Sequence, residues 1–133
     1  MGELLPAPAG WRTHAEGDGW RRMRHSQHAA VMVLQARPTD GPCDPRGVAA
    51  RLAQSAGTAE RPALVEYRGW GRFSDRDVAL QVLSAGTAHV MHAVWVDGGS
   101  CVAVAVTTTA AVAEQVGVLF AEAVAELVAG GNA

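Results

Sequence analysis

The sequence between residues 78 and 108 contains three runs of alternating side chains joined by two turns that contain glycine. In each run apolar residues recur at every second position, which is the period of a β-strand with one face toward a core. Asp97-Gly98-Gly99 separates the second run from the third, and an Asp-Gly pair between alternating runs favours a tight hairpin. This stretch therefore predicts a three-stranded antiparallel meander, around which we expect the rest of the chain to fold.

The third run of the meander has two different faces. Alternate valines from Val102 to Val106 form one face, whereas Ala103 and Ala105 lie on the other. Because alanine leaves room for a close neighbour, we expect the C-terminal helix to pack on the alanine face. A binding surface is then expected on the opposite face, where His92 of the second run interrupts a row of valines.

Upstream of the meander the alternation and the turn residues predict further strands at residues 11–15, 20–25, 29–37 and 62–73. In the last of these, two glycines flank Trp70. Glycine inside a strand indicates a bulge or a close approach of another segment.

Two segments carry the 3.6-residue period of an amphipathic helix, at about residues 44–56 and 109–128. Asp44 is a preferred N-cap residue and Gly57 is suited to the C′ position. A hydroxyl of the threonine cluster at residues 107–109 is expected to cap the second helix.

The predicted fold is α+β: a single antiparallel sheet of about six to seven strands with the two main helices packed on it. The domain is expected to span residues 11–129. Residues 1–10 are expected to be a flexible lead-in, and residues 130–133 a tail.

Charge and composition exclude several classes of partner. The 133 residues carry a net charge of −2, and all 11 basic residues are arginine, a bias that fits a GC-rich genome. Clustered basic residues in excess are needed to hold nucleic acid, so no nucleic-acid partner is expected. The N-terminus lacks a positively charged segment followed by a long apolar run, and no run approaches the length that spans a bilayer. We therefore expect a cytoplasmic location without membrane insertion.

No complete catalytic, metal or phosphate-binding motif can be assembled from the sequence. Cys43 and Cys101 lie far apart and form no CxxC, so both are expected to be reduced thiols; a disulfide is the alternative if the two sites adjoin in oxidising conditions. We expect no cofactor, no metal and no enzymatic activity.

Five residues are candidates for a binding surface: Trp70, His92, Trp95, Arg22 and Arg24. Arg22 and Arg24 belong to the densest basic run, which suits an acidic partner, or alternatively prevents sheets from associating at an edge. The tryptophans suit either a groove or the core, and Trp70 is expected to be the exception to core packing.

The order of elements resembles the PsbP-like fold, in the group that includes the LpqN and DcrB-like bacterial proteins. The resemblance covers roughly residues 8–128, from Pro8-Ala9-Gly10-Trp11 through the early hairpin, the capped helix and the antiparallel stretch to the long C-terminal helix. It implies a binding or adaptor module without a shared catalytic centre. The chain departs from the lipoprotein members because its N-terminus shows no lipid-anchor cysteine.

The sequence leaves two main hypotheses of function open, beside a third possibility, a purely structural subunit of a larger assembly. The first is a non-enzymatic cytoplasmic adaptor that presents its sheet, or a groove, to a protein or peptide partner and forms a homodimer. The alternative is a small-molecule binder or weak enzyme with a pocket lined by Trp70, Trp95 and His92.

Overall fold

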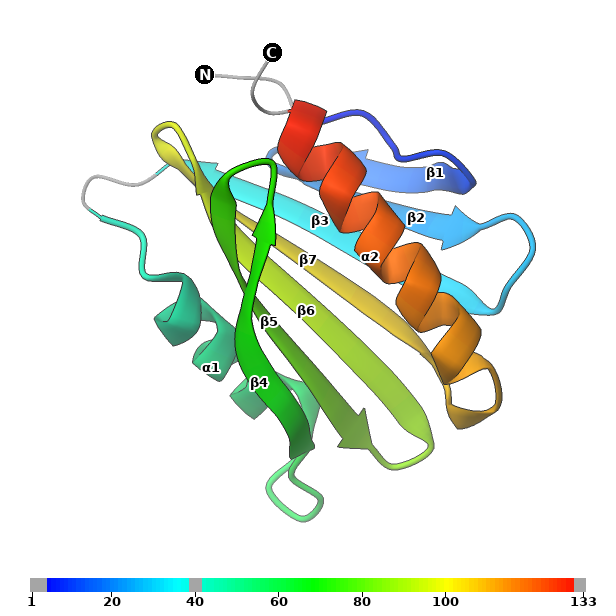
Figure 1. Cartoon of the computed structure of the whole chain (residues 1–133). Helices are drawn as coiled ribbons and strands as arrows, with labels where there is room; N and C mark the ends of the chain where they lie inside the picture. Colours follow the sequence, from blue (N-terminus) through cyan, green and yellow to red (C-terminus); the bar gives the residue numbers. More distant parts are fainter. Residues whose placement is uncertain (1–4, 39–41, 131–133) are drawn as a thin grey trace.

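The computed structural model describes residues 5–38 and 42–130, and it contains one seven-stranded antiparallel sheet (Figure 1). The strands follow the order β1-β2-β3-β7-β6-β5-β4 across the sheet. Their bounds are β1 Trp11–Gly17, β2 Trp20–His25, β3 Ala30–Pro38, β4 Leu64–Phe73, β5 Arg76–Ala85, β6 Ala88–Asp97 and β7 Ser100–Thr109. The predicted meander is confirmed as β5, β6 and β7.

Two helices lie on opposite faces of this sheet. Helix α1 spans Pro45–Ala56, and helix α2 spans Ala113–Gly130 after a short 3-10 turn, Ala110–Val112. Figure 1 shows α2 running diagonally across one face while α1 lies behind the other. The predicted α+β class, with one antiparallel sheet and two main helices, is therefore confirmed.

The main core lies between α2 and the sheet. Val116, Phe120 and Leu127 form part of the inner face of the helix, and each is at most 7% exposed. They belong to one buried cluster with the sheet residues Met23, Met32, Leu34, Ala93, Trp95, Val102, Val104 and Val106. Burying one such side chain contributes roughly 1.5–3 kcal/mol, so this cluster supplies most of the apolar stabilisation.

The predicted docking of the C-terminal helix on the alanine face of β7 is wrong. The helix packs on the valine face instead, and Ala103 packs with Ala49, Val48 and Leu52 around α1. The small side chain does allow a close neighbour, but that neighbour is α1. His92 also faces α1, because it is paired with Ala105, so the expected surface on the face opposite the alanines is wrong as well.

The helix ends differ in detail from the prediction. Asp44 stands at the N-cap of α1 but makes no side-chain cap hydrogen bond, and Gly57 has φ −115°, outside the left-handed region. Gly57 is required for space, since a Cβ there would lie 2.7 Å from the carbonyl oxygen of Arg61. The threonine hydroxyls do not cap α2 either: β7 extends through the cluster, and Thr108 Oγ1 donates to Ala29 O over 2.8 Å.

The irregularity expected around Trp70 separates into two features. The register of β4 shifts between Val65 and Tyr67, so the bulge lies nearer the start of the strand. At Gly71 a Cβ would lie 2.7 Å from Leu80 Cδ1, so this glycine allows the close approach of a side chain from β5.

A disulfide joins Cys43 to Cys101, with 5.7 Å between the two Cα atoms. The expectation of two reduced thiols is therefore wrong, because the segment before α1 passes over the start of β7. Of the residues before the domain, Leu5 packs against the main core and the Ala9 N–H donates to Glu126 Oε2 over 2.9 Å.

Candidate binding surface

Half of one sheet face carries no helix among the described residues. Helix α1 packs on β5 and β6, and the same face of β1, β2, β3 and β7 lies beside it. Met32 and Leu34 point into the α2 core, so Val31 and Val33, which alternate with them along β3, point to the uncovered side. We call this surface of β1, β2, β3 and β7 the open face.

An apolar strip runs along the middle of the open face. Val31 and Val33 on β3 lie beside Ala105 on β7, because the antiparallel register pairs Val33 with Ala105, and Ala103 continues the row to the point where α1 packs on it. All four are partly exposed. Paired valines and alanines of this kind make a flat, pleated surface on which an apolar segment can lie.

Arginines flank the apolar strip. Arg22 is paired with Val33 and Arg24 with Val31, so both predicted candidates lie on the open face; Arg12 of β1 is paired with Arg24. None of the three makes an ion pair with another described residue, and all three are exposed. The basic side of the face is therefore uncompensated, which favours an acidic partner.

A groove borders the open face where α1 meets β3. It encloses about 480 Å³, and Val48, Leu52 and Ala103 contribute apolar lining while Arg37 and Arg51 contribute guanidinium groups. The disulfide also lines it. The groove resembles the open face in its apolar centre and its arginines, but the carboxylate of Asp44 also lines it.

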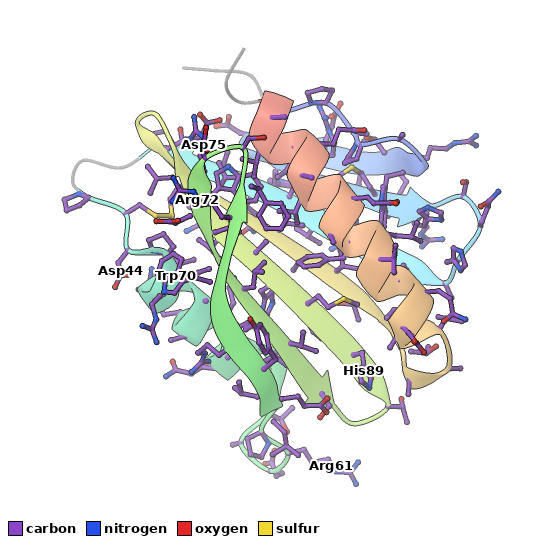
Figure 2. The ribbon with its side chains drawn as sticks, viewed as in Figure 1. Asp44, Arg61, Trp70, Arg72, Asp75 and His89 are labelled. Carbon is purple, nitrogen blue, oxygen red and sulfur yellow. A yellow bond between two sulfur atoms is a disulfide. The ribbon has the colours of Figure 1, made fainter. Side chains whose placement is uncertain are left out.

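The other three candidates do not share a pocket. Trp70 is 48% exposed on β4, at the far edge of the sheet, on the side where Figure 2 shows α1. His92 is buried under α1, and Trp95 is fully buried in the α2 core on the opposite face. The pocket lined by all three, which the sequence suggested, does not form.

His92 belongs to a buried hydrogen-bond network. Gln81 Nε2 lies 2.9 Å from His92 Nδ1 and donates to Ala49 O over 2.6 Å, and Arg68 donates twice to Gln81 Oε1 over 3.1 and 2.9 Å. Burial lowers the pKa of His92 to about 4 from 6.5. The network joins β4, β5, β6 and α1, and its geometry indicates a structural role for His92.

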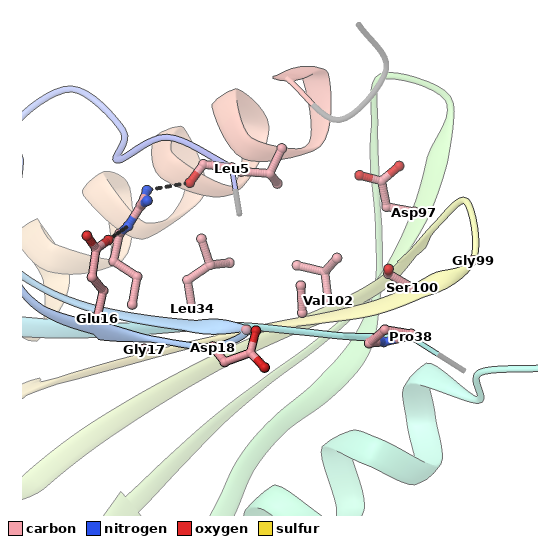
Figure 3. A pocket seen from close by; sticks show the side chains of 13 residues that line it. Leu5, Glu16, Gly17, Asp18, Leu34, Pro38, Asp97, Gly99, Ser100 and Val102 are labelled. Carbon is pink, nitrogen blue, oxygen red and sulfur yellow. Dashed lines mark hydrogen bonds and ion pairs between the residues drawn. The ribbon is translucent and has the colours of Figure 1, made fainter. Parts of the chain in front are cut away.

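A second cavity, of about 590 Å³, was not foreseen from the sequence. It lies between the β1–β2 turn and the β6–β7 turn, with Leu34 and Val102 among its apolar lining and the carboxylates of Asp18 and Asp97 among its polar lining (Figure 3). Its residues come from several separated segments, so no local motif could have indicated it. The Asp97 carboxylate forms an ion pair with Arg76 over 3.4 Å, and Arg21 also lines the cavity.

Two general properties bear on function. Among the described residues, no cluster of three or more histidine, cysteine, aspartate or glutamate side chains is placed to hold a metal ion. No helix in residues 5–38 and 42–130 is long and apolar enough to cross a membrane.

Comparison with known proteins gives a likeness of fold. No family model matches the chain, and neither does any curated protein. Among solved structures, the solution structure of PsbP from the cyanobacterium Synechocystis sp. PCC 6803 is similar, with a TM-score of 0.66 and 14% sequence identity, covering 90% of this chain and 82% of that one. The chain therefore has a PsbP-like fold. Identity this low shows the fold alone.

Proposed function

We propose that this chain is a non-enzymatic binding module that docks an acidic protein or peptide partner on its open face. The observation that carries the proposal is the apolar strip of Val31, Val33 and their β7 neighbours beside uncompensated arginines. The resemblance to LpqN and DcrB-like proteins supports the same role by analogy, because that group provides adaptors without a catalytic centre.

The chemistry of the face sets what the partner must present. A segment with apolar side chains on one side would lie on the strip, and its flanking carboxylates would meet Arg22 and Arg24. Arginine suits this task because its planar guanidinium binds a carboxylate through two parallel hydrogen bonds. Affinity should fall as salt is raised, because these charges are exposed.

The test uses a labelled peptide of alternating glutamate and valine and its lysine-valine counterpart, followed by fluorescence anisotropy. We expect the acidic peptide to bind and the basic one to bind far less. The double variant Arg22→Glu/Arg24→Glu should lose binding, whereas the matched charge change Arg46→Glu/Arg61→Glu, at exposed positions in and after α1, should keep it. Backbone amide shifts upon binding should map to β2, β3 and β7. Equal binding by the two double variants would refute the proposal.

The cytoplasmic location expected from the N-terminus remains a prediction, and one observation opposes it. Disulfides persist in oxidising compartments and are rare in the cytosol, so the Cys43–Cys101 bond favours a compartment outside it. Alkylation of thiols at the moment of cell lysis, followed by mass spectrometry, decides between the two.

The cavity of Figure 3 favours a second candidate function, a small-molecule binder, in place of the pocket of tryptophan and histidine. Asp97 is paired with Arg76, but Asp18 forms no ion pair with a described residue, so an organic amine that binds at Asp18 would be the class of ligand. A thermal-shift screen of small amines tests it: a hit abolished by Asp18→Asn supports this function, and an unchanged melting temperature across the screen rejects it.

A further inference from the structure

Strand β4 forms one edge of the sheet and carries most of the exposed apolar side chains. Of the six large hydrophobic side chains that are exposed among the described residues, four lie on it: Leu64, Val65, Tyr67 and Trp70. A long apolar edge strand offers a row of free backbone groups to another strand. Natural proteins normally protect such an edge, so its exposure in β4 indicates that something pairs with it.

The opposite edge of the sheet shows the contrast. Strand β1 is interrupted by a register shift between Thr13 and Ala15, and Arg12, His14 and Glu16 are exposed along it. Bulges and charges are the usual devices that prevent an edge from pairing. Strand β4 also has a register shift, between Val65 and Tyr67, and exposed charges at Glu66, Arg68 and Arg72. It differs from β1 because its register is uninterrupted from Tyr67 to Phe73 and this part carries the exposed Tyr67 and Trp70, whereas Trp11 of β1 is buried.

We propose that β4 pairs antiparallel with β4 of a second copy of this chain, about a two-fold axis through Gly69. The pairing would extend the sheet of one copy into the sheet of the other. It does not depend on the docking of an acidic partner, because the open face lies at the other end of the sheet.

The choice of axis follows from which face each side chain occupies. In an antiparallel pair, directly opposite residues point to the same face. A two-fold axis between two copies of one strand therefore lies midway between the two copies of a single residue, which face each other, and we name each axis by that residue. Arg68 contacts Gln81 under α1, so Arg68 and Trp70 point to the α1 face. Tyr67 points to the other face, where its hydroxyl lies 2.5 Å from the position of a Cβ on Gly69.

Axes at Arg68, Gly69, Trp70 and Gly71 differ in which side chains of the two copies they place opposite each other. An axis at Arg68 opposes the two copies of Arg68, and an axis at Trp70 opposes Arg68 and Arg72; opposed like charges are destabilising. With an axis at Gly71, Tyr67 and Arg68 would lie opposite residues beyond the end of β4, so neither would pair with the other strand. The axis at Gly69 avoids both faults.

With the axis at Gly69, the two edges are self-complementary. Arg68 of each copy faces Trp70 of the other, which places a guanidinium against an indole ring twice, an attractive cation–π arrangement. Tyr67 faces Gly71 of the other copy, where the side chains of Leu80 and Phe73 lie over the glycine and offer the tyrosine ring an apolar contact. One strand pair alone buries a small interface, so we expect a weak dimer that dissociates on dilution.

The test is sedimentation velocity over a concentration series of roughly 1–500 μM. The wild-type chain should shift from monomer to dimer across it. Trp70→Arg places like charges opposite each other twice and should weaken the dimer about tenfold or more. Trp70→Glu places a carboxylate opposite Arg68 and should retain a dimer that is now sensitive to salt.

A charge exchange then fixes the register. Arg68→Glu/Trp70→Arg should restore the dimer lost in Trp70→Arg, because only the axis at Gly69 opposes these two positions, although the folded chain should be less stable since Arg68 also donates to Gln81 Oε1. Val118→Arg is the matched control: Val118 is 59% exposed on α2 and lies outside β4. The melting temperature of each variant separates loss of pairing from loss of fold. A wild-type chain that stays monomeric throughout, or equal behaviour of Trp70→Arg and Trp70→Glu, overturns the proposal.

Discussion

Protonation of His92 should destabilise the fold, and the hydrogen-bond network determines why. Gln81 Oε1 accepts from Arg68, which directs the amide nitrogen toward Ala49 O and His92 Nδ1. Since Gln81 donates, His92 Nδ1 must accept, and the ring is neutral with its proton on Nε2. A protonated ring would turn a second N–H toward the same amide hydrogens, in a site that is 3% exposed.

The size of the effect follows from the two pKa values of His92. In the unfolded chain the pKa is 6.5, and burial lowers it to about 4 in the folded chain. Between these values the unfolded chain binds the extra proton and the folded chain does not, so stability decreases as the pH falls from 6.5 toward 4. At about 1.4 kcal/mol per pH unit, the loss over this interval is about 3 kcal/mol. Above pH 6.5 the full contribution is present.

The assay is urea unfolding followed by tryptophan fluorescence at several pH values between 4 and 7.5. His92→Asn keeps an acceptor near the position of Nδ1 but cannot titrate, so its free energy of unfolding should decline with acid by about 3 kcal/mol less than that of the wild type. His14→Asn, at an exposed position on β1, is the control and should follow the wild type. If wild type and His92→Asn lose the same stability between pH 6.5 and 4, the assignment of the network is wrong.

Three further predictions concern stability and are measured by the same unfolding assay at pH 7.5. Gln81→Leu removes the centre of the buried network and leaves its partners without their bonds, which should lower stability by about 2–4 kcal/mol, whereas an unchanged midpoint would contradict the network. Replacing Cys43 and Cys101 with serine opens a loop closed across 58 positions and should lower stability by about 4 kcal/mol relative to the oxidised chain, with added reductant producing a similar loss in the wild type alone. Phe120→Ala should lower stability by about 3–5 kcal/mol and Val118→Ala by less than about 0.5 kcal/mol, because only the side chain of Phe120 is buried in the core. Similar losses in the two variants would show that α2 does not pack on the sheet through the face that contains Phe120.

The strands and helices could be predicted because their sequence signals are local. The face of the sheet on which each helix packs could not be predicted, because it depends on residues far apart in the chain. Alternation and helical periodicity depend on neighbouring residues, and all seven strands and both helices follow them. Which helix covers which face of β7 depends on chain connections. Strand β4 lies four positions from β3 in the sheet, so the connection that contains α1 must cross one face to reach it, and Ala103 lies on that path.

The candidate site divides in the same way. Arg22 and Arg24 could be placed on one strand face from alternation alone, but their position beside Val33 and Val31 depends on the register between β2 and β3. The disulfide was equally hidden, because Cys43 reaches Cys101 only through the path of the segment before α1. Long-range register and crossover paths carry no signal in a single sequence, and they decide which side chains share a surface.

The same topology leaves the open face free for the docking that we propose. The connection from β3 to β4 places α1 on β5 and β6, so the neighbouring half of that face is left without a helix. Helix α2 follows β7 and packs on the reverse side, where Met23, Met32 and Leu34 of β2 and β3 belong to its core. The strands that carry the arginines are therefore supported by buried side chains directly behind them. A partner that docks there would meet a surface already held in one conformation. The module would therefore lose little conformational entropy on binding.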